Sequence, residues 1–182
     1  MPISEYEINN TEPPKGAPVI IKLHSSQRDM TGTGLFGDIA DGKTPDELLR
    51  DASQGEAGIY SLTTEGFLCD GDELSLFYKE TEELAGEGIT ETEIAFPKKE
   101  PKSVTIRRGG PLGTGFVIEE GKRHYSVYNT PYGSLEMCVY AKRVDNRLTE
   151  DGGVLILDYA VELKGMTAQR TKMRVDVKRK TK

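Results

Sequence analysis

The sequence has no tryptophan, only two cysteines among its 182 residues and no long apolar run. Two cysteines are too few for a disulfide framework, and Cys69 and Cys138 lack the short spacing of zinc ligands. No segment approaches the roughly 18 consecutive apolar residues of a membrane-spanning helix. The start of the chain has neither the basic residues nor the apolar centre of a secretory signal. We therefore expect a cytoplasmic protein with two reduced thiols and no membrane partner.

Acidic residues outnumber basic ones, 30 to 24, which gives a formal net charge of −6. This balance argues against a broad nucleic-acid surface. The charge is unevenly distributed, because residues 79–93 contain six glutamates and one lysine, whereas residues 170–182 contain seven bases and one acid. The basic C-terminal segment either contacts RNA or an acidic partner, or lies solvated as a frayed end.

Residues 124–144 show the clearest local pattern, that of a β-hairpin. Apolar and polar residues alternate from Ser134 to Ala141, as in a strand with one buried face. Pro131 favours the φ angle of a turn, and Gly133 allows the left-handed conformation that closes a three-residue loop with a bulge. We therefore expect two antiparallel strands joined at residues 130–133.

The same alternation recurs along most of the chain, between short segments rich in glycine, proline and charge. The predicted strands are Ala17–Gln27, Ile59–Cys69, Glu73–Thr81, Ile89–Phe96, Lys102–Arg108, Thr114–Glu119, Arg123–Asn129, the second arm of the hairpin, Val154–Leu163 and Thr171–Val177. Residues 1–16 are expected to form a flexible N-terminal arm, residues 17–178 a single domain, and residues 179–182 a basic tail.

The longest connection between predicted strands, residues 28–58, carries one helix signal. Thr44 and Glu47 form a capping box, and Pro45 stands at the first helical position. The pattern predicts one short helix near residues 45–52. Connections of this length are usually either functional or poorly ordered.

About ten short strands linked by hairpin-length loops predict an all-β fold. No helix-period segments lie between the strands, which excludes a parallel βαβ sheet. A meander of this many strands twists, and it removes its exposed edges most simply by closing on itself. We therefore predict a closed antiparallel up-and-down barrel of about 8–10 strands. A two-sheet sandwich is the alternative, because local periodicity does not separate the two architectures.

Several motifs are shared with a known family. They are Tyr78-Lys79-Glu80-Thr81-Glu82, Gly86 and Gly88, Val104-Thr105-Ile106 with Arg108 and Gly110, Glu119-Glu120-Gly121-Lys122-Arg123-His124, and Tyr128-Asn129-Thr130-Pro131-Tyr132-Gly133. In this order, over about Val19–Val177, the chain resembles the YwiB-like family of small bacterial proteins. Lys79, Glu83 and the long segment 28–58 depart from the family's pattern. The resemblance implies a calycin-type (lipocalin-like) barrel with an internal cavity, and it implies no established activity.

Tyr78, Glu80 and Glu82 occupy alternate positions of one predicted strand, so their side chains share a face. Paired carboxylates can act as acid and base or bind a cation, whereas Arg108 on a nearby strand can pair with one of them. Three interpretations remain: a structural arginine–glutamate network, ligand recognition in the barrel, and catalysis, for which no nucleophile–base pair is present. The candidate ligand-binding residues are Tyr78, Glu80, Glu82, Thr92, Arg108, Tyr128 and Tyr132. We predict no catalytic residue, metal ligand or cofactor.

Two other patterns carry weaker signals. His24 and His124 are the only histidines, and their separation in the sequence gives no support to a metal site. The glycine-rich segment 107–115 offers backbone amides that can cradle an anion, but no helix is predicted after it. A glycine-rich hairpin loop is the simpler interpretation.

We expect a non-enzymatic module that binds a small, partly polar ligand inside the barrel or at its mouth. The alternative is an RNA- or protein-interaction module that uses the basic C-terminus and the tyrosine-rich hairpin, which contains Tyr125, Tyr128, Tyr132 and Tyr140. A carboxylate-based enzyme is a third hypothesis. A homodimer is compatible with each of the three.

Overall fold

The computed structural model describes residues 15–29, 57–80, 90–109, 114–130, 133–163 and 166–181. No helix occurs in this described part of the chain, and so none there is long and apolar enough to cross a membrane. The helix predicted near residues 45–52 and the N-terminal arm up to residue 14 lie outside the described residues. The prediction of an all-β fold is confirmed.

Ten strands make up the described part. They are β1 (Ala17–Asp29), β2 (Ala57–Asp70), β3 (Glu73–Glu80), β4 (Thr90–Pro97), β5 (Ser103–Arg108), β6 (Thr114–Glu119), β7 (Arg123–Thr130), β8 (Gly133–Asn146), β9 (Gly152–Leu163) and β10 (Met166–Arg179). Strands β7 and β8 pair as the predicted hairpin, and every strand pair is antiparallel. The basic segment predicted as a tail begins inside β10, which ends at Arg179.

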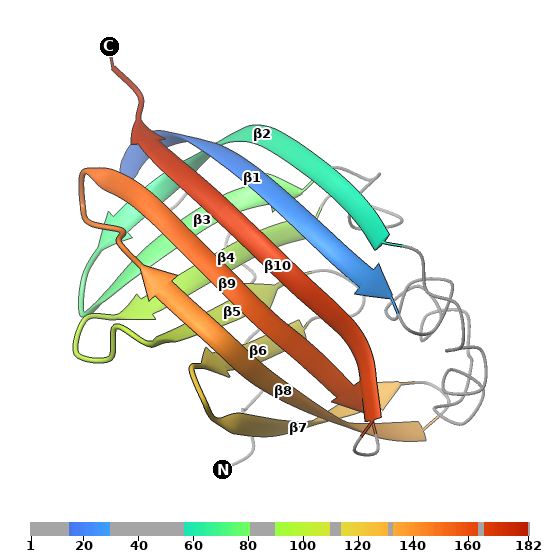
Figure 1. Ribbon diagram of the computed structural model, residues 1–182. Coiled ribbons are helices and arrows are strands. Elements are labelled where there is room, and N and C mark those ends of the chain that lie inside the picture. Colours follow the sequence, from blue (N-terminus) through green and yellow to red (C-terminus); the bar gives the residue numbers. More distant parts are fainter. Residues whose placement is uncertain are drawn as a thin grey trace.

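The strands follow one another around a single sheet in the order β6-β5-β4-β3-β2-β1-β10-β9-β8-β7. Consecutive strands are neighbours except for β6 and β7, which stand at the two ends of this order. Strand β1 pairs with β10 along eleven residue pairs, from Val19–Arg179 to Asp29–Gln169. The sheet curls into a nearly closed barrel (Figure 1), whose remaining seam lies between β6 and the β7–β8 hairpin. The up-and-down barrel is therefore confirmed over the sandwich, because one sheet contains all ten strands.

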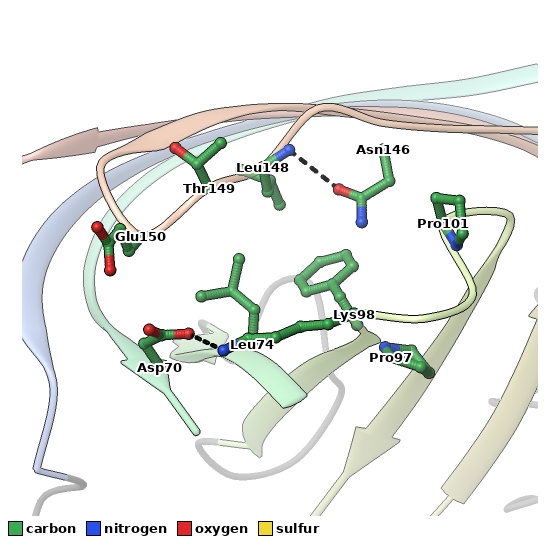
Figure 2. Close-up of a pocket in the computed structure, with 10 residues that line it drawn as sticks. Asp70, Leu74, Pro97, Lys98, Pro101, Asn146, Leu148, Thr149 and Glu150 are labelled. Atoms are coloured by element: carbon green, nitrogen blue, oxygen red, sulfur yellow. Dashed lines mark hydrogen bonds and ion pairs between the residues drawn. The ribbon is translucent and has the colours of Figure 1, made fainter. Parts of the chain in front are cut away.

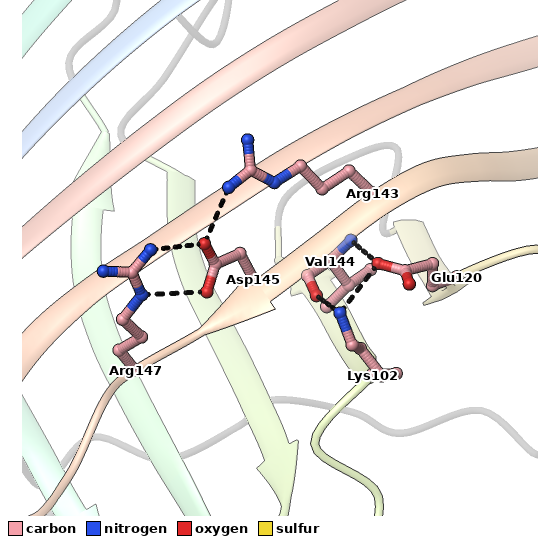
Figure 3. Close-up of polar contacts among 6 residues, drawn as sticks. All are labelled: Lys102, Glu120, Arg143, Val144, Asp145 and Arg147. Atoms are coloured by element: carbon pink, nitrogen blue, oxygen red, sulfur yellow. Dashed lines mark hydrogen bonds and ion pairs between the residues drawn. The ribbon is translucent and has the colours of Figure 1, made fainter.

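Polar contacts bridge the seam at one point. Glu120 forms a parallel bridge with Ala141, whose carbonyl also accepts a hydrogen bond of 2.9 Å from the Gly121 amide. The Glu120 carboxylate accepts hydrogen bonds from the Val144 amide at 2.8 Å and from Lys102 Nζ at 3.1 Å, as Figure 3 shows. Backbone and side-chain contacts together thus fasten β6 to the middle of β8.

A second cluster in Figure 3 orders the end of β8. Asp145 accepts hydrogen bonds from Arg143 at 2.8 Å and from both Nε and Nη2 of Arg147 at 3.0 and 2.7 Å. Arg147 and Arg143 hold the pKa of the Asp145 carboxyl well below its usual range. The forked contact with Arg147 fixes the direction in which the chain leaves β8.

The seam contact at Glu120 predicts a dependence on pH. The hydrogen bond from the Val144 amide, reinforced by Lys102, lowers the pKa of Glu120 below its ordinary value of 4.5. A carboxyl whose pKa is lowered in the folded state stabilises that state at neutral pH and loses this contribution as the pH falls through the folded value. We expect the Val144 amide resonance to titrate below pH 4.5 by NMR. In Glu120→Gln this titration should vanish; its persistence would assign it to another acid.

The two ends of the barrel differ in their connections. At the Gly71 end, short turns join β2 to β3, β4 to β5, β6 to β7 and β8 to β9. The predicted turn at Asp70–Asp72 lies here and is closed by a 3.0 Å hydrogen bond from the Gly71 amide to the Glu73 carbonyl. The opposite end, which we call the Arg108 end, is where β3 and β5 finish and β4 begins.

The core fills the half of the barrel nearest the Gly71 end and continues toward the Arg108 end on β8 and β9, where Met137 and Leu163 are fully buried. Its inward side chains are apolar and at most 2 % exposed; they include Val19, Ile21, Leu76, Ile94, Phe96, Val104, Ile118, Leu155, Val175 and Val177. Burial of this apolar surface is the main stabilising contribution to the fold. Buried polar side chains appear toward the Arg108 end on β1, β3, β4 and β10.

Strand β2 is shared unequally between its neighbours. It pairs with β1 from Ala57 to Leu68, but with β3 only from Gly66 to Asp70. The first half of β2, which lies toward the Arg108 end, is therefore not paired with the described residues of β3. Inward side chains on this half, Tyr60 and Leu62, are only partly buried. Among the described residues, the wall of the barrel is therefore less continuous at the Arg108 end than at the Gly71 end.

Candidate functional site

Polar side chains from neighbouring strands form a row inside the Arg108 end of the barrel. Tyr78 on β3 lies opposite Thr92 on β4, and Thr92 lies opposite Arg108 on β5. Cross-strand partners project to the same face of a sheet, so all three side chains point inward. Glu80 follows Tyr78 by two residues and shares its face. The pairing register thus brings together four of the predicted site residues.

Glu80 is held from two sides. Its Oε1 accepts a 2.9 Å hydrogen bond from Thr92 Oγ1 and lies 3.3 Å from Arg108 Nη2. Glu80 is 5 % exposed and Thr92 only 1 %. The Arg108 side chain keeps 29 % of its surface accessible although protein surrounds most of it. The predicted arginine–glutamate pair is present, and its arginine is the member that solvent reaches.

Three tyrosines complete this polar layer. Tyr78 is 5 % exposed, and Tyr60 on β2 and Tyr159 on β9 interact electrostatically with Arg108. Burial, reinforced by Glu80, raises the pKa of the Tyr78 hydroxyl, and burial also raises the pKa of Tyr159. Burial opposes the positive charge of Arg108, but the Glu80 carboxylate outweighs it, so the pKa of Arg108 is raised. The two tyrosines therefore stay neutral beside an ion pair.

Two buried donors in this layer are not used by the described part of the protein. Arg108 Nε and Ser25 Oγ have no hydrogen-bond partner among the described residues. Ser25 is fully buried on β1, directly opposite Tyr60. Gln27 Nε2 donates to the Tyr60 hydroxyl over 3.5 Å. An unpaired buried polar atom is costly, so these donors favour an additional binding partner.

We refer to Ser25, Tyr60, Tyr78, Glu80, Thr92, Arg108 and Tyr159 as the Arg108 layer. Tyr60, Tyr159 and Ser25 were not among the predicted site residues. Each stands at an inward position of its strand, so alternation alone could have marked them as interior polar residues. Alternation does not show that they meet β3 and β5 across the barrel.

The remaining predicted site residues are not placed by the structure. Glu82 and Tyr132 lie outside the described residues, and Tyr128 is described only as part of the β7 backbone. In the same hairpin, Tyr125 is 67 % exposed, and the Arg123 guanidinium lies 4.6 Å from the centre of the Tyr140 ring. These two tyrosines stand on the hairpin's outer face, away from the Arg108 layer.

The two histidines have separate partners. His24 Nδ1 lies 2.8 Å from Ser61 Oγ, and His124 Nε2 lies 3.0 Å from Glu119 Oε2. Within the described ranges, no group of three or more histidine, cysteine, aspartate or glutamate side chains is arranged to hold a metal ion. The centre of the glycine-rich segment 107–115, from residue 110 to 113, lies outside these ranges.

A recess opens at the Gly71 end, as Figure 2 shows. It encloses about 370 Å³ and has Leu74, Phe96 and Leu148 on its apolar side. Lys98 Nζ spans its rim to Asp70 Oδ1 at 2.6 Å. Its polar groups are therefore engaged with the neighbouring turns, in contrast to the donors of the Arg108 layer.

Thr92→Val should test how strongly Thr92 supports Glu80. The change keeps the shape of the side chain but removes the 2.9 Å hydrogen bond to a buried carboxylate. We expect the free energy of unfolding to fall by about 2 kcal/mol, because hydrogen bonds to charged groups are the stronger ones. Urea denaturation measures the change. Thr63→Val, at an exposed position of β2, is the matched control and should be nearly neutral; equal losses in both variants would contradict a special role for Thr92.

Comparisons with known proteins agree with this fold. The model of a family described as "Domain of unknown function (DUF1934)" matches residues 50–175. The crystal structure of the ywiB protein from Bacillus subtilis is similar, with a TM-score of 0.60 and 16 % sequence identity, over 91 % of this chain and 93 % of that chain. At this identity the likeness concerns the fold alone. No curated protein sequence matches the chain.

Proposed function

Because this chain belongs to the DUF1934 family, whose description assigns no activity, we propose its function from the Arg108 layer: it is a non-enzymatic module that binds a small, partly polar ligand in the barrel interior. The family match bears out the resemblance to YwiB-like proteins that the sequence motifs indicated. Neither match assigns a ligand, and the side chains of the Arg108 layer are what support the proposal.

The observation that carries the proposal is a buried, unused hydrogen-bond donor on a side chain that is itself partly accessible. Arg108 is 29 % accessible and its Nε has no partner among the described residues. Ligand sites in proteins typically combine apolar and aromatic walls with a few fixed polar groups. The Arg108 layer has both, with Tyr60 and Tyr159 as walls and Arg108 as the polar group. The mouths of small barrels are frequent positions for such sites.

The state of Glu80 favours binding over acid–base catalysis. Its Oε1 is engaged by both Thr92 and Arg108. A carboxylate oxygen held by two donors has a fixed position, which suits it to orienting an arginine. Glu80 thereby orients the guanidinium, and Arg108 presents its remaining donors to the interior.

Native mass spectrometry of protein purified gently from its own host should detect a bound small molecule. We expect a stoichiometric adduct that is lost when the layer's charged pair is removed in Glu80→Gln/Arg108→Met. The matched control is Glu93→Gln/Arg107→Met, which removes the adjacent outward pair, separated by 3.1 Å. Circular dichroism verifies that both double variants are folded. A wild-type protein without adduct, or an adduct retained in the first variant, would contradict the proposal.

A second candidate function is RNA binding on the outer face of β1 and β10. Exposed basic side chains alternate there with buried core residues. They are Lys22 and Arg28 on β1, and Arg170, Lys172, Arg174 and Lys178 on β10. Asp176, an acid on the outer face of β10, pairs with Arg174. Fluorescence anisotropy with oligouridine, at low and high salt, measures the affinity of the protein for RNA. Lys172→Glu should weaken binding several-fold if the face is used, and no detectable binding by the wild type would rule it out.

A further inference from the structure

We propose that the ligand of the Arg108 layer is an uncharged, planar compound with a hydrogen-bond-accepting group, such as a cyclic amide. This inference rests on the proposed function and specifies its chemistry. It follows from three properties of the layer: its balance of charge, its free donors and its aromatic walls.

The first property is electrical neutrality. Glu80 is the only charged residue counted as buried in the described part of the chain, and its partner is Arg108 at 3.3 Å. Tyr78 and Tyr159 remain neutral because burial raises their pKa values. An anionic ligand would bring a second negative charge toward a guanidinium that Glu80 already compensates. Leaving one uncompensated charge in a poorly solvated site is costly, whereas an uncharged ligand avoids this cost.

A cationic ligand meets the converse difficulty. It would be attracted to Glu80, but the Glu80 oxygen bonded to Arg108 also accepts the Thr92 hydrogen bond. Arg108 is the more accessible member of the pair, with 29 % of its side-chain surface open against 6 % for Glu80. A cation would therefore approach the positive partner first. Charge of either sign is disfavoured.

The second property is the nature of the unused groups. Guanidinium nitrogens only donate hydrogen bonds, and Arg108 Nε has no acceptor among the described residues. The buried Ser25 hydroxyl can donate or accept and is also unpartnered there. A ligand that satisfies Arg108 must therefore supply an acceptor such as an amide or lactam oxygen.

The third property is the aromatic lining. Tyr60, Tyr78 and Tyr159 come from three different strands, β2, β3 and β9; Tyr78 is buried in the core, and Tyr60 and Tyr159 pack against it. Aromatic side chains prefer to pack against flat rings in stacked or edge-to-face arrangements. Their hydroxyls keep the environment polar enough for a ring that carries an amide. The lining thus favours a planar ligand over a branched aliphatic one.

The test compares three compounds of the same shape and different charge: benzamide, benzoate and benzamidine. Each is titrated into the full-length protein labelled with ¹³C in its tyrosine rings, and the shifts of Tyr60, Tyr78 and Tyr159 are followed by NMR. We expect benzamide to move these resonances with a dissociation constant roughly ten-fold lower than that of either charged analogue. This comparison needs no variant, so it does not depend on a substitution that folds.

Glu80→Gln should change the preference in a specific direction. It leaves Arg108 uncompensated, so the layer becomes positive and benzoate should bind more tightly than benzamide. Glu93→Gln is the matched control, because Glu93 pairs with Arg107 on the outer face. That variant should retain the preference for benzamide.

The outcomes separate this inference from the proposed function. Wild-type protein that binds benzoate as well as benzamide at the tyrosines would overturn the inference while leaving an interior binding site. If none of the three compounds moves the tyrosine resonances, the planar-amide inference is wrong, and the host-derived adduct alone then decides the proposed function. A charged host ligand would overturn the inference and support the function.

Discussion

Gly66→Ala is expected to lower the free energy of unfolding by about 3 kcal/mol, although it adds a single methyl group. A Cβ atom at position 66 would collide with the carbonyl oxygen of Phe77 and lie 2.6 Å from Ile21 Cδ1. This carbonyl oxygen belongs to the backbone of the adjacent strand β3, so it cannot move away without loss of β2–β3 pairing. Urea denaturation followed by circular dichroism measures the change.

Gly115→Ala is the matched control for this prediction. Gly115 also lies inside a strand, β6, but a Cβ atom there would have no atom within 4 Å. Neither glycine has a positive φ angle, so backbone conformation does not separate the two substitutions. We expect the Gly115 variant to keep nearly the full stability. Similar losses at both positions would show that the effect is a general property of glycine in strands and not of close approach.

The position of Gly66 connects this prediction with the candidate site. Gly66 opposes Tyr78 and is the first residue of β2 that pairs with β3. The close approach of the two strands at this point sets where β2 leaves β3, and therefore how Tyr60 stands relative to Tyr78. An isolated glycine within a strand pattern often marks such an approach. The sequence contains this signal, but it does not identify the atom that the glycine accommodates.

The strands themselves were largely predictable, because most have one buried and one exposed face. Alternation located all ten, with bounds that differ by a few residues at most ends. The main departure is β10, which begins at Met166 and not at Thr171. A register shift between Thr167 and Gln169 interrupts the alternation there. A bulge changes which face successive residues occupy, so a period-two pattern stops at it.

Closure of the barrel was predicted with less support from the sequence. Local alternation is the same in a sandwich and in a barrel, and the deciding contact is the pairing of β1 with β10 at opposite ends of the chain. Local sequence likewise does not show that the seam lies between β6 and the β7–β8 hairpin. Residues 120–122 form a tight turn between β6 and β7, yet β7 pairs with β8 and β6 with β5. Such choices depend on the curvature of the whole sheet.

The candidate site was predicted in part for the same reason. Tyr78 and Glu80 share a face by strand geometry, and the single inward arginine of a neighbouring strand was an evident partner. Tyr159 stands about 50 residues further along the chain, on a strand whose register no local pattern sets. Only the closed barrel brings it toward Arg108. The polar layer is therefore a property of the tertiary fold.

Arg108→Met should be the most destabilising change of charge in the described part of the barrel. It leaves the buried Glu80 carboxylate without its 3.3 Å partner. Removing one member of a buried pair commonly costs 3–5 kcal/mol, and because Arg108 is 29 % accessible we expect the lower end, about 3 kcal/mol. The free energy of unfolding in urea is the measurement.

A double-mutant cycle identifies the cause of that loss. Adding Glu80→Gln to Arg108→Met removes the unpaired charge, so the double variant should be more stable than Arg108→Met alone, with a coupling energy of about 2 kcal/mol. The outward pair Glu93–Arg107, at 3.1 Å, gives the matched cycle. Because Arg107 is more exposed, its coupling should stay at or below about 1 kcal/mol.

These variants also show whether the Glu80–Arg108 pair contributes to stability or to ligand recognition. If Arg108→Met costs nothing, water or solvent-exposed groups already satisfy Glu80, and the two residues do not form a structural unit. If the double variant is as stable as the wild type yet no longer retains a bound molecule, the pair contributes recognition and not stability. Replacing a buried ion pair by uncharged residues is often neutral for folding. In that case, the role of the ion pair inside an apolar barrel is recognition, because Arg108 orients the ligand.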